Sequence, residues 1–399
     1  MPLILDRRDT LTGPGLHLFI AGVSAYEFLP GSGSGVQAEK TFGLKQLTAT
    51  AATAWLVWKK LEALDAAKRL RLPLATVHLL LSPSATEVAK HPELEGLTPR
   101  CTRRNFSRDA KAWRTCATAS NDDATLFYFA GHGVQRRQQD AVLLMDDFGD
   151  PDEASLTNCV DVHDLFNGMA PPQDVAASIA RRQMYFVDAC RMPSGEFQQN
   201  EWMRVPSLWD VGLSGVDDRV APKFYATIPG ASAFAVGGEQ TLFSFALFEA
   251  LDRLAATGPK AGEAEQRWRV TAASLRPAVE QALAKVADQH RGEQQFTTDG
   301  ALDDQPIAFY DKPPDVDVVV TIEPETALPF CELDVLTARN KPHSSLAPIA
   351  PHPVKLQLAP GVWGFRARIK ENPPQPFEEF FEFVKVELPS FPLVAKVKP

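Results

Sequence analysis

The sequence predicts an α/β fold with a mostly parallel sheet flanked by helices, followed by a small all-β, sandwich-like C-terminal domain. Apolar runs rich in aromatic and β-branched residues end abruptly at small or polar residues, as buried parallel strands do. These runs alternate with segments of helical spacing, which indicates a sheet covered on both faces. Beyond Lys312-Pro313-Pro314 the helical spacing stops. We therefore expect a first domain over residues 1–312 and an accessory domain over 315–399.

Each element of the first domain is predicted from its apolar spacing, continuous for strands and every third or fourth residue for helices. In chain order they are a strand over 16–23, a helix over 44–64, a strand over 74–81, a helix over 105–117 capped by Thr102 or Asn105, strands ending at His132 and Met145, a helix over 174–182, strands over 184–189 and 224–228, and helices over 241–256 and 277–290. Residues 191–222 show no such spacing. A loop of that length within a domain is usually functional or mobile.

The C-terminal segment consists of short apolar runs separated by Pro, Asn and Gly. Such runs, without helical spacing between them, are typical of a small β-sandwich. The predicted strands cover 316–322, 331–336, 354–358, 362–369 and 377–386.

Composition excludes several classes of protein. The chain has 399 residues and a net charge of -9 without a dense basic stripe, which argues against nucleic-acid binding. No apolar run is long enough to cross a membrane, and the N-terminus lacks the charge order of a signal peptide, so we expect a cytoplasmic protein. Five cysteines without a Cys-X-X-Cys pair favour neither a disulfide framework nor a zinc site.

Two motifs place an imidazole and a thiol after predicted strands. Gly131-His132-Gly133 ends one strand, and Asp188-Ala189-Cys190 ends another. The carboxyl ends of parallel strands meet at one edge of a sheet, where ligands bind. A thiol attacks an acyl carbon as the thiolate, so it needs a base such as imidazole. Gly133 allows a substrate backbone to approach closely, and its N–H and that of Cys190 are candidate oxyanion donors.

The two motifs together resemble those of the caspase-like cysteine peptidases, which include caspases, metacaspases and bacterial relatives. In caspases the His precedes the Cys by about 50 residues, and here the separation is 58. Asp188 stands where caspases have Gln, which is similar to the metacaspase and bacterial branch. The resemblance covers most of residues 15–310, and its further supports are Gly22, Tyr26, Leu143-Leu144-Met145-Asp146 and Thr241-Leu242-Phe243-Ser244.

The resemblance implies a role for each motif residue. Cys190 is the expected nucleophile, His132 the general base, and Gly133 and Cys190 the oxyanion donors. In the acid-bearing branch of the family, the residue two before the Cys lines the pocket for the residue before the cut bond (P1). Asp188 there would pair with Arg or Lys. The family's second acid, expected near Thr50, is absent; Glu27, Glu39 and Glu239 remain open as substitutes.

Other polar residues have a less specific interpretation. The acids Asp146, Asp147, Asp150, Asp152 and Glu153 suit Ca²⁺, on which part of the metacaspase family depends, but a solvated acidic loop is favoured. The chemistry of the dyad itself requires no cofactor. If P1 is basic, Arg204 and Arg219 are candidate self-cleavage sites. His17, His78 and His163 are expected to be packed or surface residues, and Cys101, Cys116, Cys159 and Cys331 to be inert.

These observations predict a cysteine endopeptidase that acts on protein or peptide substrates and cuts after a basic residue. The alternative is a signalling or scaffold module that keeps the fold, is catalytically weak and acts through protein contacts; the missing acid near Thr50 favours it. Accessory sandwiches on peptidases commonly recruit partners, so an activator or partner protein is expected at the C-terminal domain by analogy. No nucleic-acid or membrane partner is expected.

Overall fold

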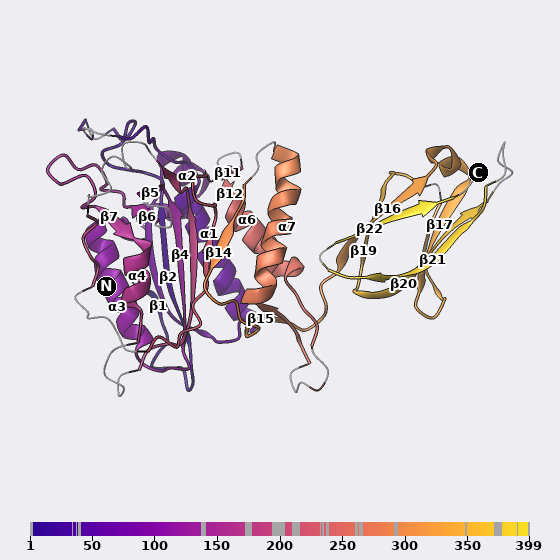
Figure 1. Cartoon of the computed structure of the whole chain (residues 1–399), viewed down its shortest axis with the longest axis horizontal. Helices are drawn as coiled ribbons and strands as arrows, with labels where there is room; N and C mark the ends of the chain where they lie inside the picture. Colours follow the sequence, from indigo (N-terminus) through magenta and orange to yellow (C-terminus); the bar gives the residue numbers. More distant parts are fainter. Residues whose placement is uncertain are drawn as a thin grey trace. The chain divides into compact units, whose positions relative to one another are not determined.

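The computed structural model describes residues 3–33, 35–36, 38, 41–136, 141–171, 178–193, 204–209, 216–231, 233, 235–236, 239–259, 262, 266–290, 294–347, 349–370, 377–388 and 390–397. The chain divides into two units, one formed by Met1–Phe248 and Val279–Ala308, the other by Glu249–Ala278 and Phe309–Pro399. Figure 1 shows both, coloured along the sequence. Each is described below by itself.

A seven-stranded sheet forms the centre of the first unit, in the order β1-β3-β2-β4-β8-β10-β14. The strands are β1 (Leu3–Asp6), β2 (Leu16–Val23), β3 (Leu74–Ser82), β4 (Ala124–Gly131), β8 (Arg182–Ala189), β10 (Lys223–Tyr225) and β14 (Thr297–Asp299). The five inner strands run parallel, and the edge strands β1 and β14 pair antiparallel. The predicted fold class is confirmed, because β2, β3 and β4 are buried along their whole length.

Helices cover this sheet on both faces. The α-helices of the described chain are α1 (Thr50–Ala66), α2 (Ala85–Lys90), α3 (Arg103–Ala117), α4 (Val162–Gly168), α6 (Leu242–Glu249) and α7 (Ala272–His290), and the two units divide within α7. α1 lies so close to β2 that a Cβ on Gly22 would be 2.6 Å from the Cβ of Ala54. On the other face Phe106 and Trp113 of α3 pack on Phe19 with ring centroids 4.8 and 5.8 Å away.

A small second sheet continues the central strands beyond their carboxyl ends. It has the order β7-β6-β5-β9 and consists of β5 (Gly133–Gln135), β6 (Val142–Leu144), β7 (Cys159–Asp161) and β9 (Met192–Pro193). β5 follows β4 after His132 alone, and β9 follows β8 after Cys190 and Arg191. A short hairpin of β11 (Ala235–Val236) and β12 (Gln240–Thr241) precedes α6. The chain around both predicted catalytic residues therefore stays hydrogen-bonded on either side of them.

Several predicted helices differ from the structure, the last of them by beginning at Ala272 rather than at residue 277. The first begins at Thr50 rather than at residue 44, because residues 44–49 form a loop fastened to the end of β2. The helix predicted over 174–182 lies partly outside the described residues. Its described part, 178–181, is not helical, because the N–H groups of Ile179 and Arg181 donate to the side chain and backbone of Asn121. Elsewhere the predicted N-cap is found at Thr102, which accepts from the N–H of Asn105.

The C-terminal part of the second unit is a sandwich of two sheets, in the orders β19-β16-β22 and β18-β17-β20-β21. Its strands are β16 (Val316–Glu323), β17 (Cys331–Thr337), β18 (Pro342–Leu346), β19 (Val354–Leu358), β20 (Gly361–Ile369), β21 (Phe380–Val386) and β22 (Ser390–Lys396). All pairs are antiparallel except β16 with β22. Inward residues such as Val318, Val335 and Phe365 form a shared core, which confirms the sandwich-like prediction. Within the described residues, no helix is long and apolar enough to cross a membrane.

Candidate active site

The register of the parallel strands sets His132 beside Cys190. Gly131 of β4 pairs with Ala189 of β8, and Val134 of β5 pairs with Met192 of β9. The two residues of each pair are 58 positions apart in the sequence. The same offset places His132 opposite Cys190, in the stretch between the two pairs. Side chains at equal register on neighbouring parallel strands point to the same side. The structure thus aligns His132 and Cys190 on neighbouring strands, at the carboxyl edge of the sheet where the sequence places both.

Lys45 and Tyr26 fix the position of His132. Its Nε2 lies 2.7 Å from the carbonyl oxygen of Lys45, which can only accept, so Nε2 carries the proton. The backbone N–H of His132 donates to the Tyr26 hydroxyl at 2.7 Å, and the two rings lie 5.0 Å apart at their centroids. Burial lowers the pKa of His132. The resting imidazole is therefore neutral, with Nδ1 unprotonated and able to accept a proton.

Gln46 fastens the loop that carries the Lys45 carbonyl. Its Oε1 accepts from the N–H of Tyr26 at 2.7 Å, while its Nε2 donates to the carbonyls of Tyr26 and Leu29 at 2.8 and 3.0 Å. One amide thus ties the loop before α1 to the chain that follows β2. Sequence reasoning missed Gln46 and Lys45, because the first acts on backbone groups and the second through its own carbonyl.

The Cys190 thiol accepts a hydrogen bond from the backbone of Ala233. The N–H of Ala233 donates to Sγ at 3.1 Å. Burial raises the pKa of Cys190, so the resting thiol is protonated. Within the described contacts no hydrogen bond joins the thiol to His132 in this state. Cys190 is half-buried, whereas Cys101, Cys116, Cys159 and Cys331 are buried.

Gly133 is required by the close approach of β5 to the chain after β8. A Cβ at this position would lie 2.6 Å from the carbonyl oxygen of Cys190 and 2.9 Å from the Cβ of Ala189. Any larger residue would push the two strands apart beside His132 and Cys190. Its predicted contribution to an oxyanion hole stays a prediction.

Asp188 lies below the thiol on the same side of β8, because residues two apart on a strand share a face. It is buried, and its Oδ2 accepts from the hydroxyls of Tyr128, at 2.7 Å, and Thr241. Burial raises its pKa to about 6. Among the described residues nothing donates to its Oδ1 and no cation pairs with it.

The candidates for the missing second acid are dispersed. The Thr50 hydroxyl donates to the carbonyl of Val23 at the start of α1. Glu27 forms an ion pair with Arg100, Glu239 is exposed in a turn, and Glu39 lies outside the described residues. The structure thus joins neither described candidate to Asp188.

Sequence reasoning also missed Glu87 of α2. Its buried carboxylate accepts from the N–H of Ala52 and from the hydroxyls of Ser24 and Ser84, each within 2.9 Å. Its partner Ser84, at the start of a capping box, was the signal that could have found it. Glu87 closes the N-terminus of α1 with every oxygen occupied, which suits a structural role.

The acidic group after β6 is only partly the solvated loop that was expected. Asp152 and Glu153 are exposed, but Asp146 is fully buried, since the Arg100 Nε and the Ser82 hydroxyl satisfy its Oδ2. Asp147 accepts from the N–H of Arg103 at the start of α3, and burial raises its pKa to about 6. Across the described part of the chain, no group of His, Cys, Asp and Glu is arranged to hold a metal ion.

The structure also shows how far three further histidines and the two candidate self-cleavage sites are buried. His17 and His78 are buried as expected, and His163 is exposed on α4. Arg204 is exposed, as a cleavage site requires. The Arg219 side chain is 1% exposed, because it bonds to Asp217, Gln183 and the carbonyl of Phe166, so it is a poor candidate in this state.

A parallel sheet with a His and a Cys at adjacent carboxyl ends is the arrangement of a cysteine-peptidase fold. The sequence matches the family model described as the caspase domain over residues 81–297, more than half of the chain, and the chain belongs to this family of cysteine peptidases. No curated protein matches the chain.

Two solved structures are similar to the chain at low identity. One is the protein GSU0716 from Geobacter sulfurreducens, with 14% identity, a TM-score of 0.39, and coverage of 73% of this chain and 95% of that one. The other is caspase-1 from Spodoptera frugiperda, with 15% identity, a TM-score of 0.39, and coverage of 72% and 86%. The family assignment rests on the match over residues 81–297.

Proposed function

We propose that the chain is a cysteine endopeptidase that cuts protein substrates after a basic residue, with Cys190 as nucleophile and His132 as base. The observation that supports the proposal is the shared 58-residue register, which aligns the two residues on neighbouring strands. The glycine at 133, the fixed tautomer of His132 and the neutral resting thiol are consistent with it.

In this mechanism His132 takes the thiol proton through Nδ1 as Sγ attacks the carbonyl carbon of the cut bond. The Lys45 carbonyl, hydrogen-bonded to Nε2–H, stabilises the imidazolium that forms. The C–N bond then breaks, the proton passes from His132 to the leaving amine, and a thioester remains on Cys190. Water, deprotonated by His132, hydrolyses the thioester and restores the thiol. The N–H groups of Gly133 and Cys190 are proposed to stabilise the oxyanion.

The preference for a basic P1 residue is supported by the state of Asp188. Its carboxylate lies two residues before the nucleophile, has an oxygen without a described donor, and has no cation of its own. A guanidinium or ammonium group would supply both the donors and the charge. Asp188 is buried in this structure, beneath the hydroxyls of Tyr128 and Thr241.

The test compares the wild-type protein with Cys190→Ala on fluorogenic peptides ending in Arg, Lys or Asp. We expect cleavage after Arg and Lys, loss of at least a thousandfold in the variant, and no change in the matched control Cys331→Ala. Undiminished cleavage by Cys190→Ala would contradict the mechanism and favour the scaffold alternative. A preference for Asp would contradict the role of Asp188 alone.

We further propose that residues 1–312 form the peptidase domain and residues 315–399 an accessory domain that binds an activator or substrate protein. The sandwich has its own apolar core, which supports a separate accessory domain, although Glu249–Ala278 group with the second unit. Limited proteolysis should cut near Lys312-Pro313-Pro314 and release a folded C-terminal fragment; cuts within the sandwich strands alone would contradict the boundary.

A further inference from the structure

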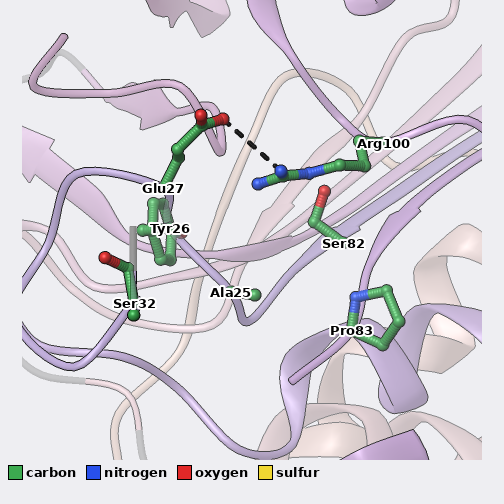
Figure 2. A pocket seen from close by; sticks show the side chains of 8 residues that line it. Ala25, Tyr26, Glu27, Ser32, Ser82, Pro83 and Arg100 are labelled. Carbon is green, nitrogen blue, oxygen red and sulfur yellow. Dashed lines mark hydrogen bonds and ion pairs between the residues drawn. The ribbon is translucent and has the colours of Figure 1, made fainter. Parts of the chain in front are cut away.

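The two members of the dyad have different neighbours, because β2 flanks β4 and β10 flanks β8. On the His132 side the chain after β2 contributes Tyr26, which with Arg100 is among the residues that line a cavity of about 490 Å³ (Figure 2). On the Cys190 side the chain after β10 contacts the thiol itself, through the N–H of Ala233. The reactivity of a cysteine depends on the groups around its sulfur. The chain after β10 is therefore where we look for residues that act on the nucleophile.

Arg191 fastens the chain after β10 at three points. Its N–H donates to the carbonyl of Ala231 at 3.1 Å, and its carbonyl accepts from the N–H of Gly230 at 2.8 Å. Its side chain reaches further back along the chain, where Nε donates to the carbonyl of Thr227 at 3.1 Å. The residue that follows the nucleophile thus holds the segment from Thr227 to Ala231, which ends two residues before Ala233.

The Arg191 guanidinium is buried without an opposite charge. It lies over the ring of Tyr225, 4.4 Å from the centroid. Among the described residues no carboxylate forms an ion pair with it, and nothing accepts from its Nη2. A buried cation costs free energy, which an aromatic face and one carbonyl offset only in part. An apolar side chain would fill the same space without this cost, so packing alone does not account for the guanidinium.

A second side chain holds the same segment from the strand that follows His132. Gln135 of β5 is buried, and its Oε1 accepts from the N–H of Gly230 at 3.1 Å. That N–H is therefore shared between the Gln135 side chain and the Arg191 carbonyl. The segment is tied to the strand of the base as well as to the strand of the nucleophile.

The N–H of Ala233, which follows this segment, lies 3.1 Å from the Sγ of Cys190. Hydrogen bonds to an ionised acceptor are roughly twice as strong as those to a neutral one. The bond therefore gains strength when His132 removes the thiol proton, and it favours the thiolate. The negative charge of Asp188 acts in the opposite direction.

We propose that Arg191 is a positioning residue, which holds the chain after β10 so that the Ala233 N–H stabilises the Cys190 thiolate. The proposal rests on the endopeptidase function above and deepens it. It assigns Arg191 to the nucleophile rather than to the P1 pocket that contains Asp188.

The first test does not depend on catalysis and measures the rate at which iodoacetamide alkylates Cys190 between pH 7 and pH 10. The pKa of Asp188 is about 6 and burial holds that of His132 below its usual value, so of these three groups only the thiol changes its charge in this range. In Arg191→Gln we expect the curve to move to higher pH and the rate at pH 8 to fall on the order of tenfold, because the thiolate loses a charge-assisted hydrogen bond. In Arg191→Lys, which keeps the charge but not the planar donor group, the fall should be about threefold.

The matched control is Arg114→Gln. Arg114 also donates through Nε to a backbone carbonyl, that of Gly168 at 2.6 Å, but it belongs to α3. Its alkylation curve should coincide with that of the wild type. A wild-type curve in Arg191→Gln would overturn the proposal, as would faster alkylation with an unchanged pH dependence, since the segment would then only shield the thiol.

A second variant removes the N–H itself. Ala233→Pro should reproduce the shift, and adding Arg191→Gln to it should move the curve no further, since both changes act on one bond. Additive shifts would contradict the proposal. Circular dichroism and thermal melts establish that each variant is folded. Where Arg191→Gln is not, Gln135→Leu, which removes one acceptor from the same segment, should shift the curve in the same direction by about two- to threefold.

Activity separates this role from substrate binding. On Arg- and Lys-coumarin peptides, Arg191→Gln should lower kcat on the order of tenfold and leave KM within about twofold of the wild-type value. A rise in KM with unchanged alkylation would place Arg191 in the P1 pocket and overturn the proposal. If the wild type cleaves neither peptide while the alkylation shift persists, the peptidase function fails and the positioning role stands.

Discussion

Two buried aspartates at the carboxyl edge of the sheet, Asp146 and Asp188, have different surroundings. Each has one oxygen that accepts hydrogen bonds and one that has no described partner. Asp146 receives the guanidinium of Arg100 and the hydroxyl of Ser82. Asp188 receives only two neutral hydroxyls.

The difference teaches which carboxylate is free to recognise a ligand. A buried carboxylate is costly unless it is paired, and Asp146 is paired within the fold. Asp188 has hydrogen bonds but, among the described residues, no opposite charge, so its ionised form carries a cost that a bound cation would relieve. A site that lacks only a cation is suited to bind one. The predictions below change one side of this comparison at a time.

The largest expected effect is on the P1 preference. Asp188→Asn keeps an acceptor for Tyr128 and Thr241 but removes the charge, and losing one partner of a buried charge pair costs 2–5 kcal/mol. We expect kcat/KM for Arg peptides to fall on the order of 100-fold, with little change for a peptide with norleucine at P1. Asp146→Asn is the control. An equal loss for both peptides would mean that Asp188 supports the dyad rather than the pocket.

The next prediction concerns stability, which the same substitution should increase rather than decrease. The pKa of Asp188 is raised from 3.8 to about 6, so the folded state binds a proton more tightly than the unfolded state does. Its ionised form therefore destabilises the fold above pH 6, and this cost disappears as the pH falls toward 4. Asp188→Asn should increase the free energy of unfolding at pH 7 by on the order of 2–3 kcal/mol. Urea unfolding at pH 4 and pH 7 measures this; a variant that is less stable at pH 7 would contradict the unrelieved cost.

A smaller effect is expected when Asp146 is made to resemble Asp188. Arg100→Gln removes the cation beside a buried carboxylate, and Arg100 is half exposed, so we expect a loss of about 1–2 kcal/mol at pH 7. The pKa of Asp146 is already raised by burial and should rise further. The loss should shrink as the pH falls and Asp146 is protonated in both states. Lys59→Gln, on the exposed face of α1, serves as the control; a loss independent of pH would point to packing instead.

The smallest effect concerns the thiols. Cys190 is half-buried and the other four cysteines are buried, so iodoacetamide should label Cys190 first. The reaction should be slow at pH 7, because burial raises the pKa of Cys190, and it should accelerate as the pH rises. Mass spectrometry of tryptic peptides gives the order of labelling. Faster labelling of Cys159 would contradict the enclosure seen around it.

Much of the framework could be predicted from the sequence, because apolar runs report burial directly. The strand predicted over 16–23 is β2 at the same residues, and the positions of His132 and Cys190 after strands followed from where their apolar runs end. The family prediction is confirmed. The catalytic roles and the P1 preference stay predictions.

The rest could not be predicted, because it depends on backbone groups or on pairing between distant segments. The Lys45 carbonyl and the Ala233 N–H belong to groups that every such residue carries. Asp146 looks like a surface acid beside its acidic neighbours, and only the approach of Arg100 from another segment permits its burial. Apolar spacing predicts the start of α1 six residues too early, since it does not show that Gln46 fastens the preceding loop.

The pairing of β4 with β8 constrains how the chain length can vary. One residue inserted into either strand would turn every following side chain to the opposite face, and would separate the thiol from the imidazole. The segment between the two strands is under no such limit, because its loops can lengthen without altering the ladder. Length variation between the two motifs should therefore be confined to the connections, and the strand lengths should be fixed.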